Sequence, residues 1–138
     1  MGQILLASAA GIFLMMGTLH CMWTLRDLVH PRYFTPTDET VRIAMQGARL
    51  TFNPRANVWQ AWLGFNLSHS LGLVVFGGVL LAFALRDFTV FAASGLAQAG
   101  AVVVAGTYFV LAIRFWFWGP ALGSGIAVLC ILAALLVA

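Results

Sequence analysis

Four long apolar stretches dominate this chain of 138 residues. A helix that crosses a bilayer needs about 20 mainly apolar residues, because the hydrocarbon core is about 30 Å thick and each residue adds about 1.5 Å. Inside lipid the backbone must satisfy its own hydrogen bonds, so such stretches form helices. The sequence therefore predicts an all-α integral membrane protein. Its fold is a four-transmembrane-helix bundle in a single transmembrane domain over residues 1–138, with spans at residues 3–25, 58–85, 89–113 and 120–138.

The composition excludes several other classes of protein. Hydrophobic residues make up 62% of the chain and charged residues 8%. In soluble domains, hydrophobic residues make up roughly 45–50% of the chain and charged residues about 25%. These values exclude a soluble globular protein, a disordered tail and a nucleic-acid-binding protein. The two cysteines, Cys21 and Cys130, lie inside apolar runs, which is not the pattern of a disulfide framework.

The arginines predict how the spans are oriented. With four spans, both termini share one side, and the long loop at residues 26–57 lies on the other side with the turn between spans three and four. The terminal side carries only Arg86, whereas the loop side carries Arg26, Arg32, Arg42, Arg49, Arg55 and Arg114. Positive residues favour the cytoplasmic side. The loop should therefore be cytoplasmic, and both termini should lie on the outer side.

The long loop contains the pattern of a short amphipathic helix. Thr35 suits the N-cap, Pro36 the first helical position and Asp38 the third. Asn53 and Pro54 would end the helix. We expect this helix to lie on the cytoplasmic leaflet or to cap the bundle. Its apolar face would carry Val41, Ala44, Met45 and Ala48.

Three polar residues stand out inside the predicted spans: His20, Asn66 and His69. No Asp or Glu falls within those spans, which argues against a carboxylate proton relay. His20 should lie about 9 Å below the interface, and His69 roughly 10–15 Å. Because neighbouring spans run antiparallel, the two histidines are expected at similar depth.

Helical spacing places these residues on defined faces. Trp62, Asn66 and His69 recur at spacings of four and three, which predicts that they share a stripe facing His20. A mostly apolar wall with a few polar groups is typical of a ligand cavity. The sequence predicts an intramembrane cavity for a lipid, isoprenoid or quinone. The predicted ligand-binding residues are His20, Trp62, Asn66, His69, Tyr108 and Arg114, the last placed to hold an anionic headgroup at the cytoplasmic mouth.

Other interpretations stay open at this point. Asn66 and His69 could hydrogen-bond between helices purely as packing contacts, and Arg114 could be an ordinary interfacial anchor. His20 and His69 could ligate haem iron from two sides. Copper ligation by Met16, His20 and Cys21 is disfavoured, because neighbouring helical residues point about 100° apart. No metal site and no catalytic residue are assigned, and whether the chain is an enzyme is left open.

Small residues also recur every four positions, which favours close helix packing. The second span carries Gly64, Ser68 and Gly72, and the third carries Ala93, Ala97, Ala101 and Ala105. Such stripes pack within one chain or between chains. An alternative function is therefore a structural or accessory subunit of a larger membrane complex, or a homo-oligomer, with membrane lipids as the other partners.

Three local patterns together resemble a known family. They are residues 59–72, which include Gly-Phe-Asn-Leu-Ser-His-Ser-Leu-Gly, the Arg-Phe-Trp-Phe run at residues 114–117 with Pro120, and Gly-Thr-Leu-His at residues 17–20. The set is similar to small bacterial four-span membrane proteins with a Gly-Phe-Asn-x-Ser-His-Ser-x-Gly signature. This resemblance implies a multi-pass protein of the bacterial inner membrane and implies no activity. A looser likeness is to the sterol-isomerase and sigma-2-receptor architecture, whose membrane carboxylates are missing here.

Overall fold

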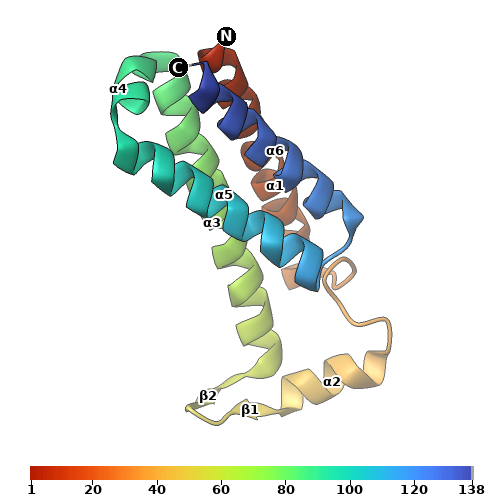
Figure 1. Cartoon of the computed structure of the whole chain (residues 1–138). Coiled ribbons are helices and arrows are strands. Elements are labelled where there is room, and N and C mark those ends of the chain that lie inside the picture. Colours follow the sequence, from red (N-terminus) through yellow and green to blue (C-terminus); the bar gives the residue numbers. More distant parts are fainter. Residues whose placement is uncertain (138) are drawn as a thin grey trace. The chain divides into compact units, whose positions relative to one another are not determined.

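Helices make up most of the computed structural model, which describes residues 1–137 (Figure 1). Helices α1, α3, α5 and α6 are long and apolar enough to cross a membrane. The prediction of an all-α, multi-pass membrane protein is confirmed, and a four-helix bundle is compatible with these elements. In chain order the elements are α1 (Gly2–Val29), α2 (Glu39–Gly47), β1 (Arg49–Leu50), β2 (Asn53–Asn57), α3 (Val58–Arg86), α4 (Phe88–Ala93), α5 (Gly95–Phe115) and α6 (Trp118–Leu136).

The chain forms two compact units, which we call the core unit and the polar unit. The core unit comprises Met1–Met16 and Leu73–Ala138, and the polar unit comprises Gly17–Gly72. Helices α1 and α3 each contribute one part to each unit. The apolar cluster lies in the core unit, whereas the loop, the hairpin and the central histidines belong to the polar unit.

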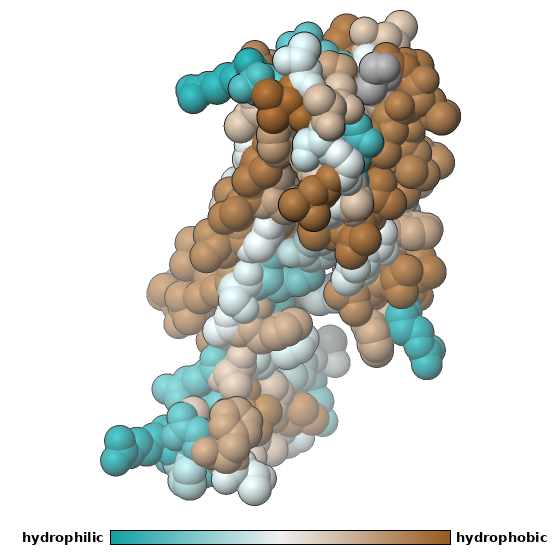
Figure 2. Space-filling view, turned by 60° about the vertical axis from the view of Figure 1, so that its left-hand side comes forward, coloured by the Kyte–Doolittle hydropathy of each residue, from teal (hydrophilic) through white to brown (hydrophobic). Residues whose placement is uncertain are grey.

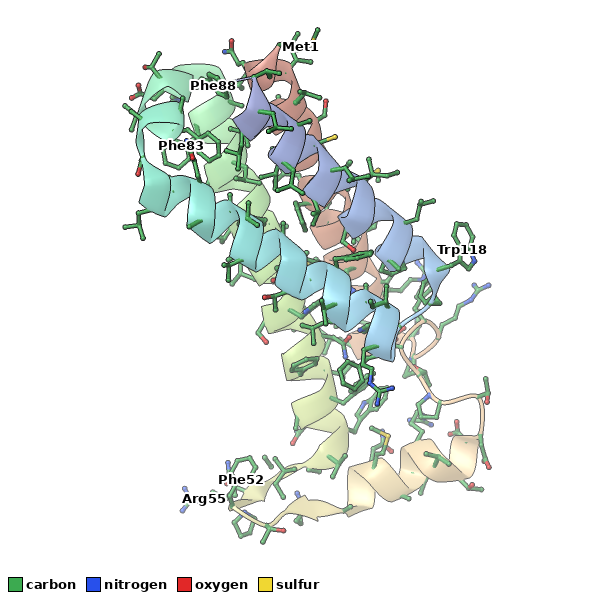
Figure 3. All side chains as sticks on the ribbon, viewed as in Figure 1. Met1, Phe52, Arg55, Phe83, Phe88 and Trp118 are labelled. Carbon is green, nitrogen blue, oxygen red and sulfur yellow. The ribbon has the colours of Figure 1, made fainter. Side chains whose placement is uncertain are left out.

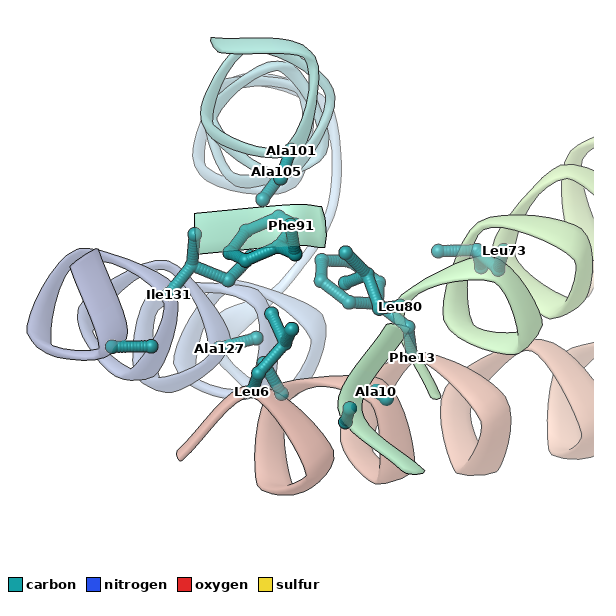
Figure 4. Packing of buried hydrophobic residues seen from close by; sticks show 13 residues of the cluster. Leu6, Ala10, Phe13, Leu73, Leu80, Phe91, Ala101, Ala105, Ala127 and Ile131 are labelled. Atoms are coloured by element: carbon teal, nitrogen blue, oxygen red, sulfur yellow. The ribbon is translucent and has the colours of Figure 1, made fainter. Parts of the chain in front are cut away.

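Close packing of small and aromatic side chains holds the core unit together (Figure 4). The ring of Phe13 is fully buried and meets the ring of Phe76 edge-on, with centroids 4.9 Å apart. At Gly77 the backbone of α1 comes so close that a Cβ would lie 2.9 Å from the carbonyl oxygen of Ala10. Lipid tails are as apolar as Leu, so association depends on this kind of close van der Waals packing.

The predicted third span is broken in the structure. Residues 88–93 form the separate helix α4, and α5 begins only at Gly95. Ser94 ends one helix and caps the next, since its Oγ accepts a hydrogen bond from the backbone N–H of Ala97 at 3.2 Å. Phe91, which is almost fully buried, anchors the short helix in the core (Figure 4). Apolar composition alone did not reveal this break.

Apolar side chains also cover the outside of the long helices (Figure 2). Leu129 on α6 and Val103 on α5 are largely exposed, whereas Ala127 and Ala105 on the same helices are fully buried. On α5 and α6 the buried positions are therefore mainly small residues, and many of the larger aliphatic residues face outward. This arrangement suits helices that are surrounded by lipid.

The loop between α1 and α3 differs from its prediction. Helix α2 begins after Asp38, whose carboxylate accepts the N–H of Thr40 at 2.8 Å, so Thr35 is not the N-cap. The Thr35 hydroxyl instead donates to the Asp27 carboxylate at 3.4 Å. The helix ends at Gly47, and Asn53 belongs to an antiparallel β1–β2 hairpin that sequence spacing did not predict. No residue of α2 is buried, and its contact with a membrane leaflet stays a prediction.

Candidate functional site

The polar unit joins α1 to α3 through a His–Asn pair. His20 Nε2 lies 3.0 Å from Asn66 Oδ1, and the Asn66 side chain is fully buried. Asn66 Nδ2 donates to the carbonyl oxygen of Trp62 at 2.8 Å. That bond fixes the orientation of the amide, so Oδ1 is the acceptor and His20 Nε2 carries the proton. The pair therefore holds His20 in one tautomer.

A second imidazole lies beside the first. The ring centroids of His20 and His69 are 5.2 Å apart, with the planes inclined by 57°. His69 also faces Phe65 at 6.1 Å in a nearly parallel arrangement. Both histidine residues are half-buried. Two adjacent imidazoles thus border the buried Asn66.

The chain that follows α1 folds back over His20. The Phe34 ring stacks on the imidazole with centroids 4.3 Å apart and planes 23° from parallel. The carbonyl oxygen of Phe34 accepts a hydrogen bond from Trp62 Nε1 at 2.7 Å. Phe34 is thus tied to α3 through its backbone and to α1 through its ring.

Asp27 anchors the same segment and was missed by sequence reasoning. Its fully buried carboxylate accepts the backbone N–H groups of Arg32 at 2.8 Å, Tyr33 at 2.9 Å and Phe34 at 2.6 Å. Helix α1 continues to Val29, so Asp27 lies within the helix and beyond the predicted span end at residue 25. The spacing His20, Thr24, Asp27 marks one helical face, and this spacing was the available signal.

The predicted ligand residues divide between the units. His20, Trp62, Asn66 and His69 come together in the polar unit, and the predicted stripe facing His20 is confirmed for Asn66 and His69. Tyr108 and Arg114 belong to the core unit. There Tyr108 packs 5.9 Å from Phe13, and the exposed Arg114 lies over the ring of Phe115 at 5.9 Å. Their role in binding a ligand stays a prediction.

A metal ion and a haem require different sets of protein ligands at this site. Within residues 1–137, no three His, Cys, Asp or Glu side chains are arranged to hold a metal ion. Haem ligation by two histidines needs only His20 and His69, but His20 Nε2 is bonded to Asn66. Ligation through that nitrogen would break the bond and leave the buried amide oxygen unsatisfied, which costs about 1–3 kcal/mol. The arrangement is better suited to hydrogen bonding than to ligation.

Comparison of the chain with protein-family models, with curated proteins and with solved structures gives no match. The resemblance to small bacterial four-span proteins therefore stays an expectation from the sequence. The chemistry of the site is interpreted from its own residues.

Proposed function

We propose that this protein binds an apolar ligand whose polar head hydrogen-bonds to the imidazoles of His20 and His69. The observation that supports the proposal is the buried Asn66, which fixes the tautomer of a half-buried histidine beside a second histidine. A packing contact alone does not require two adjacent, partly exposed imidazoles. The residues that would bind this ligand all belong to the polar unit.

The chemistry of the site limits the class of ligand. A neutral imidazole donates through one nitrogen and accepts through the other. The N–H of His20 is used by Asn66, so His20 would accept from a hydroxyl head, whereas His69 would donate to a carbonyl or accept from a hydroxyl. The surrounding rings of Phe34 and Phe65 are apolar and suit a hydrocarbon or isoprenoid tail. A lipid, an isoprenoid alcohol or a quinone meets both requirements. Asn66 and Trp62 would act as positioning residues.

We place the protein in the bacterial inner membrane with both termini on the outer side. Four candidate spans support a multi-pass arrangement. The excess of arginine between spans one and two supports a cytoplasmic loop. The bacterial assignment rests on the sequence resemblance alone.

The test extracts the full chain in polymer-bounded native membrane discs and identifies small molecules that remain bound. We compare wild type, His69→Ala and the control His30→Ala, whose exposed side chain lies outside the two long helices of the site. A co-purifying isoprenoid, quinone or lipid that is retained by the control and lost in His69→Ala supports the proposal. An unchanged small-molecule content with a lower melting temperature in His69→Ala would identify a packing contact instead.

A second function is favoured by the outward face of α3. Gly64 and Ser68 are exposed, and a Cβ added at Gly64 would meet no atom within 4 Å. Small exposed residues let another helix approach closely, so the chain would be an accessory subunit of a larger membrane complex. The same disc preparation tests this function, because a stoichiometric second protein lost in Gly64→Leu would support it.

A further inference from the structure

An exposed aromatic side chain lies between two arginines in the β1–β2 hairpin. Phe52 is 86% exposed, and Arg49 and Arg55 are also exposed. Figure 3 shows Phe52 and Arg55 together at the outer end of the hairpin. Arg49 lies at the base of the hairpin, where it pairs with Asn57. An exposed apolar ring on a short hairpin with a cation near each end suits the boundary between water and lipid.

The hairpin is joined to a membrane span without a linker. Strand β2 ends at Asn57, and α3 begins at Val58. Asn57 Oδ1 accepts the N–H of Gln60 at 2.8 Å, and Gln60 Oε1 accepts the N–H of Asn57 at 3.4 Å, which is a reciprocal cap. This cap fixes the angle at which the strand enters the helix. With α3 as a membrane span, the hairpin lies at the membrane surface when the lipid begins near Val58.

The direction of the hairpin keeps its tip near that surface. Figure 1 shows β2 running sideways from the start of α3 rather than continuing its axis. A five-residue strand is about 17 Å long, whereas the headgroup layer of one leaflet is about 5–8 Å thick. An upright hairpin would carry Phe52 into water. A hairpin that lies along the surface keeps the ring within the headgroup layer.

The charges of the hairpin indicate which lipid it meets. In α2, Arg42 pairs with Glu39. No carboxylate among residues 1–137 forms a salt bridge with Arg49 or Arg55. The hairpin as a whole is therefore cationic, and each basic residue near an anionic leaflet contributes about 1 kcal/mol of attraction.

We propose that the β1–β2 hairpin is an anchor for anionic lipid headgroups. The Phe52 ring enters the headgroup layer, and the guanidinium groups of Arg55 near the tip and Arg49 at the base bind lipid phosphates. The anchor fixes the start of α3 at a defined depth in the membrane. It is independent of any ligand bound at His20 and His69.

The test measures the depth of residue 52 in the full chain. A Phe52→Cys variant with Cys21→Ala and Cys130→Ala carries an environment-sensitive fluorophore and is placed in lipid nanodiscs. One set contains phosphatidylcholine alone, and the other contains 30% phosphatidylglycerol. Quenching by a lipid spin-labelled at the headgroup reports insertion, and quenching by a neutral water-soluble nitroxide reports exposure to water.

We expect at least a threefold higher ratio of lipid quenching to aqueous nitroxide quenching in the anionic discs. Arg49→Gln with Arg55→Gln should abolish that difference, as should 0.5 M salt. Arg86→Gln removes a positive charge from an exposed arginine at the other end of α3, and this control should preserve the difference, whereas Arg49→Gln or Arg55→Gln alone should reduce it. Aqueous nitroxide quenching that is equal in both lipids, or anionic preference that survives the double substitution, would overturn the proposal.

Discussion

His20 Nε2 and Asn66 Oδ1 lie 3.0 Å apart and connect helix α1 to helix α3 within the polar unit. The other end of the same amide bonds to the carbonyl of Trp62, one turn earlier in α3. Asn66 is fully buried, yet both ends of its side chain are used. An amide in this position links two membrane helices and orients an imidazole without leaving a polar atom unsatisfied.

Replacing Asn66 with alanine should destabilise the polar unit. The change removes the acceptor of His20 Nε2 and the donor to Trp62, so we expect a loss of about 1–3 kcal/mol. The measurement is the melting temperature in detergent by circular dichroism. Ser68→Ala on the exposed face of α3 is the control, since its hydroxyl bonds only within its own helix. Equal melting temperatures for the two variants would contradict the bridging role of Asn66.

Asp27→Asn should loosen the segment that covers His20. Both carboxylate oxygens accept backbone N–H groups from Arg32, Tyr33 and Phe34, whereas an amide has one acceptor oxygen. We expect the backbone amides of these three residues to exchange with deuterium at least tenfold faster. The control is Asp87→Asn, because Asp87 makes no side-chain capping bond at the start of α4. Unchanged exchange at residues 32–34 would show that Asp27 does not hold this segment.

Two adjacent glycines in α3 should respond in opposite ways to alanine. A Cβ at Gly77 would lie 2.9 Å from backbone atoms of Ala10 and Leu14, so Gly77→Ala forces α1 away and should cost about 1–3 kcal/mol. A Cβ at Gly78 would meet nothing within 4 Å, so Gly78→Ala should gain up to about 1 kcal/mol from helix propensity. Melting temperatures in one detergent compare the pair. A stable Gly77→Ala would mean that the helices do not cross there.

The start of α2 should depend on pH. Hydrogen bonds from the Thr40 hydroxyl and backbone amide hold the pKa of the Asp38 carboxyl below its ordinary value of 3.8. A lowered pKa means that the stabilising effect is complete above pH 3.8 and is lost as the pH falls through the pKa of the folded state. The amide resonance of Thr40, followed by NMR in micelles, should titrate below pH 3.8. Asp38→Asn should keep the cap and abolish the titration, because asparagine also caps helices.

The orientation of the spans can be read from fusions to the C-terminus. Alkaline phosphatase at this position should be active and a fluorescent protein should be dark, because the arginine excess predicts an outer C-terminus. Fused after Arg55 instead, alkaline phosphatase should be inactive and the fluorescent protein should fluoresce. Active phosphatase after Arg55 together with a fluorescent C-terminus would reverse the orientation.

The long helices were predictable because apolar length alone decides whether a segment spans a bilayer. The contact between His20, Asn66 and His69 was predictable for a related reason, since polar side chains at membrane depth seek one another and helical spacing sets their faces. Local sequence patterns therefore predicted the structure well in the membrane-spanning segments.

The loop was harder to predict because its order comes from contacts that are distant in sequence. Thr35 has the side chain of a good N-cap, but the Asp27 carboxylate engages it, and Asp38 caps the helix instead. The hairpin lacks a strong turn dipeptide, and the break at Ser94 is hidden within an apolar run. Two residues had side chains suited to cap the helix, and hydrogen bonds between residues distant in sequence determined which one does so.

The unequal lengths of the four membrane helices bear on the bilayer that suits the protein. Helices α5 and α6 have 21 and 19 residues, whereas α1 and α3 have 28 and 29. At about 1.5 Å per residue the first pair is about 30 Å long, which matches the hydrocarbon core, and the second pair is about 12 Å longer. Thinner membranes would force α1 and α3 to tilt or to project into the headgroups. Helix length thus makes the protein sensitive to membrane thickness, so acyl-chain length should affect its stability even at constant headgroup composition.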